Sequence, residues 1–403
     1  MASPDRRQRE RRADPPPSAG VKRWQHRTVP PEATFDRLFP LCETVGISRI
    51  ADLTGLDRIG IPVFQAVRPM GRSLSVSQGK GMTQAAARVS AMMEAIEIWH
   101  AENLILPGWR ARADAPGRPA IAAADLAALS IAPPVNGNDI PWTEATDCGT
   151  GNPVAVPRDL ASLDFTHDGD PPWLLRSTDG LAGGNTPDEA FASALAELIE
   201  RRCKAEFHAA PPQAQAVRRI DPALLAGDSP AIAALTGLVL DAGLDLDLFD
   251  MTNSLGVTAI KALIYDTDSA GPTRRPCSGH GAHLDPETAV IRALTEAAQA
   301  RLTHISGNRD DLEPGHYRAH PLDNSLRRLT RGMDFADRRR GLDLTDQSGH
   351  TVKSDGNRML KRILAAGAGP VLALDLTHPD LGVPVIKLLA PALRRGSAAG
   401  AAH

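Results

Sequence analysis

Aromatic residues, cysteines and long apolar runs are scarce in this sequence. Phe, Trp and Tyr make up 4% of the 403 residues, which argues against a surface that stacks nucleic-acid bases. The cysteines form no CxxC pair, so we expect reduced thiols and neither a structural zinc site nor a disulfide framework. No apolar run is long enough to span a bilayer, and the N-terminus lacks the apolar stretch of a secretory signal. These absences predict a cytoplasmic protein.

A dominant charge of one sign is also missing, because 45 basic and 48 acidic residues leave a formal charge of -3. Such a chain has no global field for DNA, RNA or an anionic membrane, so we expect no nucleic-acid or membrane partner. Residues 1–26 are Arg- and Pro-rich and cannot bury apolar surface. They are predicted to form a disordered basic tail, with weak anion binding as the less favoured alternative.

The length predicts two sub-domains or one large composite domain. Alternating strand and helix patterns predict a mixed α/β fold with helices packed on β-sheets. We assign residues 27–391 to one domain, with sub-parts at about 27–106, 135–307 and 355–391, and residues 392–403 to a flexible tail. Helices are expected at 31–45, from after residue 81 to about 103, and at 122–129, 187–207, 230–242 and 286–305. Strands are expected at 47–51, 62–67, 142–147, 153–157, 244–250, 257–265, 371–375 and 383–389, and residues 308–354 are predicted to be irregular.

A serine followed by two glutamates recurs with identical spacing in two of the predicted helices. The motifs are Ser90-x3-Glu94-x2-Glu97 and Ser193-x3-Glu197-x2-Glu200-Arg201. At about 100° per residue, the serine and both glutamates share an arc of roughly 60°. Each helix therefore presents one acidic stripe, which Glu189 extends by one turn in the second helix.

The apolar neighbours of both stripes indicate helices that are largely buried. Like charges in such surroundings repel unless a cation lies between them, and Mg2+ bound through carboxylates, waters and phosphate oxygens would be that cation. For a single glutamate, a solvated helix face is the better interpretation. The recurrence of the motif after a Gly-rich loop favours a metal and phosphate site instead.

Glycines precede both helices, in Gly79-Lys80-Gly81 and in Gly183-Gly184-Asn185. Neither segment is a Walker A motif, since Lys80 is followed by glycine rather than Ser or Thr. Glycines before a helix N-terminus still let backbone N–H groups approach a phosphate, and Lys80 can add a point charge. We therefore expect two loops that contact nucleotide phosphates.

The paired acidic helices resemble the YcaO superfamily, whose nucleotide site is built from helices of this Ser-x3-Glu-x2-Glu kind. The resemblance runs from Arg27 to about Pro391 and implies a YcaO-type fold with an internally duplicated Gly-rich loop and acidic helix. It also implies ATP and Mg2+ as cofactors and a homodimer. Two departures are notable: Ile98 replaces an arginine that often ends the first motif, and Ala182 and Ser193 stand where some members carry Ser and Gln.

The resemblance assigns roles by position. The implied Mg2+ ligands are Glu94, Glu97, Glu189, Glu197 and Glu200. The expected ATP contacts, which include Lys80 from the loop argument, are Arg27, Thr34, Lys80, Ser90, Asn185, Ser193, Arg201, Gln299 and Arg301. The implied catalytic residues are Arg201, Arg301 and Glu200, with both arginines neutralising charge on the phosphates. Glu296 matches a later acidic position of the family.

YcaO enzymes activate an amide oxygen by phosphorylation, so that a nucleophile can replace it. The stretch from Thr54 to Pro69 resembles the branch that accompanies TfuA-type partner proteins, which is linked to thioamidation. The C-terminus also lacks the Pro-x-Pro-x-Pro end typical of azoline-forming members. We therefore expect a peptide or protein substrate, a TfuA-like partner and a thioamide product. An azoline-forming cyclodehydratase, a non-catalytic peptide-docking scaffold of the same fold and a Mg2+-dependent nucleotidyl transferase are the alternatives.

Other polar residues carry less information. His280 and His283 have an HxxH spacing, but no third ligand lies nearby in the sequence, so a polar loop or a substrate contact is favoured over a metal. Cys148 and Cys203 lack an activating motif and are interpreted as structural. Asp57 and Arg58 are either substrate contacts or a simple turn pair, and the sequence leaves both open.

Overall fold

The computed structural model describes residues 26–133, 139–166, 173–266, 276–312, 329 and 340–394. The predictions for residues 1–25 and 395–403, and for most of the segment expected to be irregular, lie outside the described residues. The mixed helix and sheet architecture is confirmed, and all four cysteines are free thiols. The proposed division into sub-parts stays a prediction.

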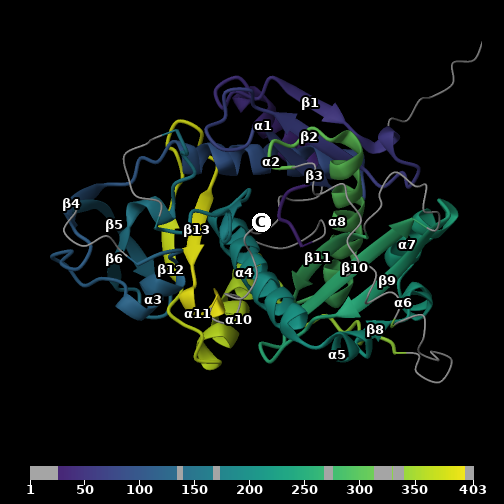
Figure 1. The fold of residues 1–403 in the computed structure, drawn as a ribbon. Helices are drawn as coiled ribbons and strands as arrows, with labels where there is room; N and C mark the ends of the chain where they lie inside the picture. The colour runs from purple at the N-terminus through teal and green to yellow at the C-terminus, as the bar shows by residue number, and fades with distance from the viewer. Residues whose placement is uncertain are drawn as a thin grey trace, which may run out of the picture.

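Three antiparallel sheets form the framework (Figure 1). The first is three-stranded, with β1 (Arg49–Asp52), β2 (Val63–Val67) and β3 (Val76–Lys80). The second has the order β11 (Cys277–His283), β10 (Thr258–Asp266), β9 (Leu244–Asp250) and β8 (Arg219–Ile220). The third has the order β4 (Gly108–Arg112), β5 (Asp139–Asp147), β12 (Leu372–Asp375), β13 (Val385–Leu389) and β7 (Leu181–Gly183), with β6 (Pro153–Pro157) paired to β5. The strands β12 and β13 thus close a sheet that begins more than 200 residues earlier in the chain.

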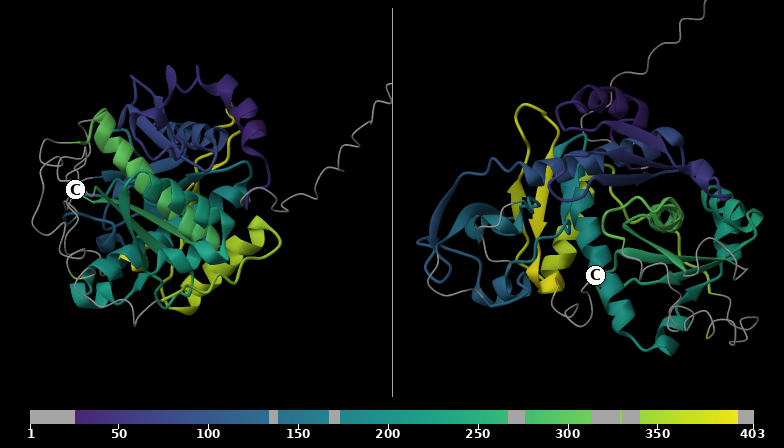
Figure 2. Two further views of the ribbon diagram at one scale, coloured as in Figure 1. Left: turned by 90° about the vertical axis from the view of Figure 1, so that its right-hand side faces the viewer. Right: turned by 45° about the horizontal axis from the view of Figure 1, so that its top comes forward.

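The larger helices pack on these sheets and on one another. They are α1 (Pro31–Leu38), α2 (Gln84–Glu102), α4 (Pro187–Ala209), α7 (Pro230–Asp241), α8 (Pro286–Ser306) and α10 (Val352–Ala365). The short elements are α3 (Ala123–Ala128), α5 (Pro212–Ala216), α6 (Pro222–Asp228), α11 (Pro391–Arg394) and the 3-10 turns η1 (Phe39–Leu41), η2 (Thr54–Leu56) and η3 (Arg158–Leu160). In both Figure 1 and the right view of Figure 2, α4 passes through the middle of the molecule, between the six-stranded and the four-stranded sheet.

The starts of the three site helices follow from their caps. The hydroxyls of Thr83 and Thr186 accept the N–H groups of Ala86 and Glu189 at the starts of α2 and α4. The carboxylate of Asp285 does the same at the start of α8. Proline at the first position of α4 and α8 fits this geometry, because a first-turn residue needs no N–H partner. These caps fix where each acidic stripe begins.

The Gly-rich segments were expected to be loops, and this expectation is wrong in part. Gly79 lies within β3 and Gly279 within β11, each packed directly against the following helix. A Cβ on Gly79 would lie 2.0 Å from the backbone nitrogen of Ala91, and one on Gly279 would lie 2.1 Å from that of Ala297. These glycines therefore allow close contact between strand and helix. The two segments were predicted to be loops because glycine is generally depleted in strands.

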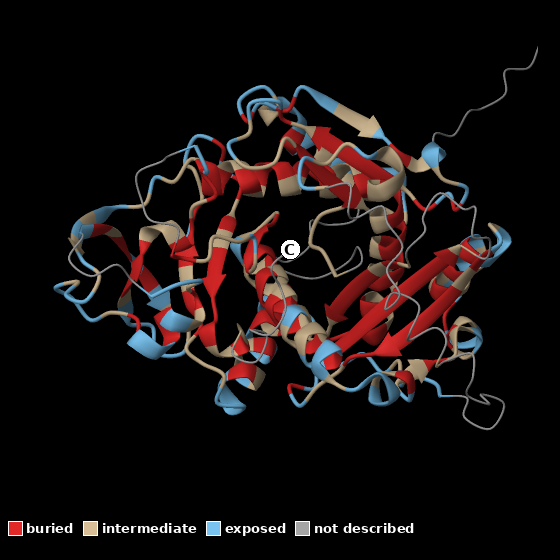
Figure 3. Cartoon of the chain, in the orientation of Figure 1, coloured by how far each residue is buried: buried red, intermediate tan, exposed pale blue. Residues whose placement is uncertain are grey.

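The four-stranded sheet is buried on both faces (Figure 3). Along β10, Ile260 and Ala262 pack with α7 and α8, whereas Ala259 and Leu263 pack towards α4 and α10. This alternation follows from the two-residue period of a strand. Lys261 has the same parity as Ala259 and is only 8% exposed, so it enters the α4 side of the sheet.

Two helical segments differ from the expectation. The first helix ends at Leu38 and continues as the 3-10 turn η1, which contains Pro40, a residue that has no N–H to continue an α-helix. The helix α10 lies across the end of the segment expected to be irregular. It begins with a capping box of Thr351 and Ser354 and buries Met359 and Ile363. This helix was not predicted because most of its residues are polar and only one narrow stripe is apolar.

Candidate active site

Carboxylates from three helices meet at the centre of the structure. Glu94 and Glu97 come from α2, Glu197 and Glu200 from α4, and Glu296 from α8. Burial is the largest cause of the raised pKa values of Glu97 and Glu200, and the negative charges add to it: Glu94 and Glu197 raise the pKa of Glu97, and Glu296 and Glu197 raise that of Glu200. The structure therefore brings both predicted stripes together and adds a third acidic helix. We call these five residues the carboxylate cluster.

Backbone N–H groups in the neighbouring strands, or in the turn just before one of them, hold four of these carboxylates in place. The N–H of Gln78 in β3 donates to Glu94 at 3.2 Å, and that of Gly183 in β7 donates to Glu97 at 2.5 Å. The remaining two bonds, each of 3.2 Å, run from Gly180 to Glu197 and from His280 to Glu296. The strands thus set the positions of the carboxylates, and the glycines let the strands approach closely enough to do so.

Burial is the largest cause of the raised pKa values in the cluster. It raises the pKa of Glu94 and of Glu200 to about 7 and that of Glu97 to about 8, and it also raises the pKa of Glu197. Glu296 behaves differently. Burial would raise its pKa, but Lys80 and His280 outweigh burial and hold the pKa well below the usual range. A bound proton or a cation would relieve the repulsion among the other four.

Basic side chains surround the cluster. Lys80 forms an ion pair with Glu296, and Arg201 lies 3.2 Å from Glu197 and 3.4 Å from Asp179. Arg292 was not predicted, although its charge acts on both Glu200 and Glu296. It lies one helical turn before Glu296 on α8, so its position could have been read from the spacing. Arg201 and Arg292 are therefore available on two sides of the acidic groups.

A second group of polar residues, which includes the predicted Asn185 and Glu189, gathers at the first turns of α4. Thr28 donates its N–H at 2.7 Å and its hydroxyl at 2.6 Å to Glu189. Asn185 donates its backbone and side-chain N–H groups to the same carboxylate at 2.9 and 3.1 Å. Burial would raise the pKa of Glu189, but Arg27 and Thr28 outweigh it and the pKa is lowered. Glu189 is thus an ionised group that holds the N-terminal segment, unlike the four glutamates with raised pKa values.

The remaining predicted nucleotide contacts lie beside these two groups. Arg27 donates to Ser193 at 3.4 Å, and the Thr34 hydroxyl donates to the Asn185 side-chain oxygen at 3.1 Å. Gln299 donates to the carbonyl of Gln78 at 3.1 Å, in the strand that holds Glu94. Ser90 lies one turn before Glu94 on α2, against Gly79.

Arg301 is the predicted residue that the structure places elsewhere. Its side chain is fully buried, and its guanidinium lies 2.7 Å from Asp57 and 2.6 Å from Asp266. Five residues separate it from Glu296, which turns it about 140° around α8 and away from the cluster. The expected contact with phosphate is corrected to a buried ion pair. The same geometry settles Asp57 as the partner of Arg301, while Arg58 lies 3.3 Å from Asp266.

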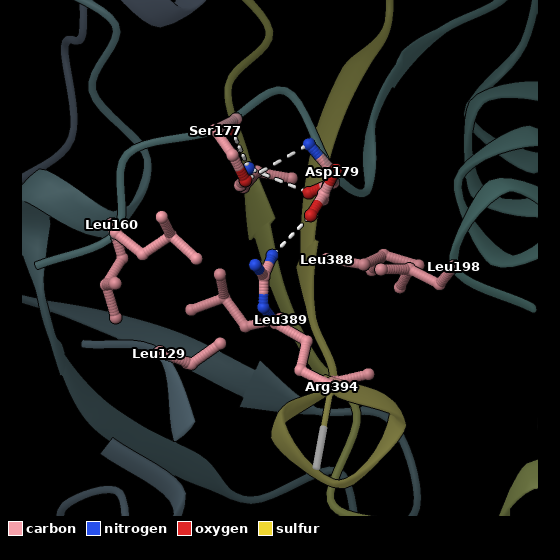
Figure 4. Close-up of a pocket in the computed structure, with 11 residues that line it drawn as sticks. Leu129, Leu160, Ser177, Asp179, Leu198, Leu388, Leu389 and Arg394 are labelled. Atoms are coloured by element: carbon pink, nitrogen blue, oxygen red, sulfur yellow. Dashed lines mark hydrogen bonds and ion pairs between the residues drawn. The ribbon is translucent and has the colours of Figure 1, made fainter. Parts of the chain in front are cut away.

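A small cavity of about 20 Å³ lies next to the cluster, beside Asp179 (Figure 4). Arg394 forms an ion pair with Asp179, and the buried Lys387 donates to the carbonyl of Asp179 at 2.8 Å. Burial lowers the pKa of Lys387 to about 8. Asp179 thereby connects the last described helix with Arg201, a link that no sequence pattern indicated.

The acidic stripe of α4 continues into a basic one. Lys204 and His208 follow Glu200 at successive intervals of four residues, so they occupy the same face of the helix. The ammonium of Lys261 lies 2.9 Å from Nε2 of His208, and the ring of His280, cross-strand neighbour of Lys261, faces the same space. Burial lowers the pKa of Lys261 to about 8 and that of His280 to about 4. Lys204 and His208 could have been predicted from the sequence, because they lie four and eight residues after Glu200 and therefore on the same face of the helix.

Among the described residues, no helix combines the length and the apolar character that crossing a membrane requires.

Comparisons with known proteins agree on one family. A family model described as YcaO cyclodehydratase, ATP- and Mg2+-binding, matches residues 78–394. A protein encoded in the tfuA 3' region of Rhizobium leguminosarum bv. trifolii is 36% identical over 383 residues, covering 93% of this chain and 90% of that protein. A protein of Methanothermobacter thermautotrophicus is 32% identical over 396 residues, covering 91% and 94%.

Solved structures show the same fold. The YcaO protein of Methanopyrus kandleri, bound with AMPPCP and Mg2+, matches with a TM-score of 0.69 and 24% identity over 91% of each chain. A heterocyclase in complex with substrate and cofactor matches with a TM-score of 0.72 and 20% identity, covering 94% of this chain and 54% of that chain.

Proposed function

Because the chain belongs to the YcaO family of ATP- and Mg2+-binding proteins, we propose that it activates the backbone amide of a peptide by phosphorylating the amide oxygen. The observation that carries this proposal is the carboxylate cluster. Glu94, Glu97, Glu197 and Glu200 are recessed acidic groups with raised pKa values, next to Arg201 and Lys80. A phosphoryl-transfer site needs this combination of cation ligands and basic groups.

The residues present fit Mg2+. The donor set consists of carboxylate oxygens, which are hard ligands, and their mutual repulsion is the kind that a divalent cation relieves. Glu94, Glu97, Glu197 and Glu200 would hold the ions, while Glu189 holds the N-terminal segment and would act through Asn185 and Thr28. Bound Mg2+ supplies positive charge between the carboxylates and the phosphate oxygens.

Side chains of the chain itself would carry the other tasks. Arg201 is held by Glu197 and Asp179 at the edge of the cluster, where it can face the phosphate that receives negative charge. Arg292 lies on the opposite helix and can do the same from the other side. Arg27 and Thr34 lie at the N-terminal end of α4 and would contact the rest of the nucleotide.

We propose hydrosulfide as the nucleophile and a thioamide as the product. The amide oxygen takes the terminal phosphoryl group of ATP, hydrosulfide adds to the carbon, and the oxygen leaves as part of phosphate. The proton of hydrosulfide ends on that phosphate, so the products are thioamide, ADP and hydrogen phosphate and the reaction balances. The relative encoded in the tfuA 3' region of Rhizobium supports a TfuA-like partner for this branch.

Nucleotide binding tests the site without knowledge of the peptide. The double variant Glu197→Gln, Glu200→Gln keeps the side-chain shape and should weaken Mg2+-dependent binding of a fluorescent ATP analogue by more than tenfold. Glu206→Gln is the matched control, because Glu206 lies on the same helix but is exposed and paired with Arg202. Equal affinity in the double variant and the control would remove the cluster from the nucleotide site.

Product analysis separates the alternatives. Peptide incubated with the protein, a TfuA-like partner, Mg2+, ATP and sulfide should gain the mass difference between sulfur and oxygen and release ADP. Loss of water alone would assign the chain to azoline formation. Release of AMP would indicate a nucleotidyl transferase, and nucleotide binding without any turnover would indicate a docking scaffold.

A further inference from the structure

Two histidines and one aspartate from distant parts of the chain meet outside the carboxylate cluster. His26 precedes the N-terminal segment that binds Glu189, His283 ends β11, and Asp355 lies in the first turn of α10. One ligand atom from each residue lies within 4.8 Å of the other two. We propose that these three side chains bind a divalent metal ion of the Zn2+ type. The bound ion would hold the N-terminal segment in position beside the nucleotide site.

The sequence argued against a metal at His280 and His283, and the structure explains why that pair was misleading. Residues three apart on a strand point to opposite faces, so His280 faces α4 while His283 does not share its surroundings. The ring of His283 instead lies 4.5 Å from the ring of His26. The partners of His283 are therefore separated from it by 257 and 72 residues, and no spacing rule could indicate them.

The hydrogen bonds around His26 prepare it to bind a metal. Its Nε2 lies 2.9 Å from Asp285, and because an ionised carboxylate only accepts, Nε2 must carry the proton. In the neutral ring the lone pair is then on Nδ1. Asp285 is itself fixed by the hydroxyl of Thr288 at 2.6 Å. A carboxylate that orients a histidine in this way is the usual outer partner of a metal-binding imidazole.

The other two residues are fixed by backbone groups. Asp355 is buried, and one of its oxygens accepts the N–H of Gly349 at 2.6 Å. Nδ1 of His283 accepts the N–H of Asp285 at 3.0 Å. A metal bound at either nitrogen of His283 would replace this bond, because the neutral ring has a single lone-pair nitrogen. Metal binding thus exchanges one ordinary hydrogen bond for a coordinate bond.

The backbone at His26 supports a ligand at this place. Its φ angle is 65°, in the left-handed region, and it is the single non-glycine residue with positive φ among those the structure describes. Such a conformation persists where the surroundings require it, and it is concentrated at ligand sites. Here it directs the ring towards Asp285 and His283 rather than away from the protein.

The ligand types select the metal. Two imidazole nitrogens and one carboxylate oxygen suit Zn2+, Co2+ or Ni2+, whereas Mg2+ prefers oxygen ligands alone. In a tetrahedral zinc site with bonds of about 2.1 Å, ligand atoms lie about 3.4 Å apart, so the present spacing, which is within 4.8 Å, needs a contraction of at most about 1.4 Å. Three protein ligands leave one position for water. The site is therefore distinct in chemistry from the carboxylate cluster.

The metal would act on the nucleotide site through the chain. Arg27 and Thr28 follow His26 directly and contact Ser193 and Glu189. Fixing His26 to β11 and α10 removes freedom from this segment and so holds both residues at the start of α4. This role is one of positioning, and it does not depend on which nucleophile the enzyme uses.

Cobalt titration tests the site directly. The full-length protein, freed of metal with a chelator, should bind one Co2+ per chain in the presence of excess Mg2+, with the visible absorption of a low-coordinate site. His26→Ala and His283→Ala should each weaken binding by at least tenfold. His378→Ala is the matched control and should change affinity by less than twofold, because His378 is also half-buried and lies 3.7 Å from a carboxylate, Asp380.

Two further outcomes decide the proposal. Co2+ that binds equally well to the wild type and to the His26→Ala, His283→Ala double variant would show adventitious binding and overturn the site. Zn2+ should also slow hydrogen exchange at residues 27–29 in the wild type and not in His26→Ala, which removes only a half-buried side chain near the N-terminal end of the described residues. Unchanged exchange in the wild type would overturn the positioning role, whatever the result of nucleotide binding.

Discussion

Replacing Glu97 by glutamine should stabilise the protein without metal and weaken its response to Mg2+. The carboxylate of Glu97 accepts the N–H of Gly183 at 2.5 Å, and the amide oxygen of glutamine can accept the same bond. Glu97→Gln thus keeps the shape and the hydrogen bond and removes only the charge. The two effects have opposite signs, so a general loss of packing cannot imitate them.

The magnitude follows from the pKa of Glu97. Burial, together with Glu94 and Glu197, raises the pKa from 4.5 to about 8. The folded protein therefore holds a proton that the unfolded chain releases, and the free energy of unfolding falls as pH rises from about 4.5 to about 8. The ceiling of this loss is about 5 kcal/mol, at about 1.4 kcal/mol per pKa unit. Solvent near the recessed carboxylate lowers the expected value to about 2 kcal/mol.

Thermal unfolding measures the difference. In a chelator, Glu97→Gln and the wild type should unfold at the same temperature near pH 4, and the variant should gain roughly 2–4 °C above pH 8. Millimolar Mg2+ should raise the unfolding temperature of the wild type, because the ion binds the folded state, and should raise that of the variant less.

Two results would refute this reasoning. A variant that is less stable than the wild type at pH 9 in chelator would show that the charge of Glu97 is not under strain. A stability difference that is the same at pH 4 and pH 9 would show that it does not come from ionisation. Glu206→Gln should show neither effect, since exposed ion pairs contribute at most about 1 kcal/mol.

Two further predictions concern the framework of the site. Gly79→Ala should cost several kcal/mol in the free energy of unfolding, because its Cβ would lie 2.0 Å from the nitrogen of Ala91, whereas Gly55→Ala has open space and should change little; equal denaturation midpoints would contradict this. Arg301→Met should cost about 3–5 kcal/mol, because it leaves Asp57 and Asp266 buried without their partner, and it should leave nucleotide affinity of the folded protein unchanged. If Arg301→Met left stability unchanged and abolished nucleotide binding, Arg301 would instead be a phosphate contact.

Helix periodicity explains why part of the site could be predicted from sequence. The arc shared by Ser, Glu and Glu depends only on their spacing, so the stripes of α2 and α4 could be recognised before any tertiary contact was known. The acidic face of α8 was harder to recognise from the sequence, for two reasons. This face carries a single glutamate, and more residues separate it from the glycine in the preceding strand. Gly79 and Ser90 are 11 residues apart, whereas Gly279 and Glu296, which hold corresponding places, are 17 apart.

Other contacts follow from no local rule. Thr28 reaches Glu189 across 161 residues, and His26 reaches Asp285 across 259. Arg301 illustrates a different difficulty. A match of residue type at a family position says nothing about the side of the helix, and an offset of five residues from Glu296 places the guanidinium among other carboxylates.

The bond between Glu97 and Gly183 has a consequence for how the protein can be divided. Glu97 belongs to the first helix and strand unit, and the N–H that fixes it belongs to the second, 86 residues later. If the chain were cut between the two units, the acidic stripes of α2 and α4 would lie on separate fragments. The N-terminal fragment would then lack both the glutamates of α4 and the Gly183 N–H group that orients Glu97. The two fragments should associate more tightly when Mg2+ and nucleotide are present, because the complete ligand set exists only in the assembled pair. Nucleotide binding would therefore report correct assembly of the two fragments.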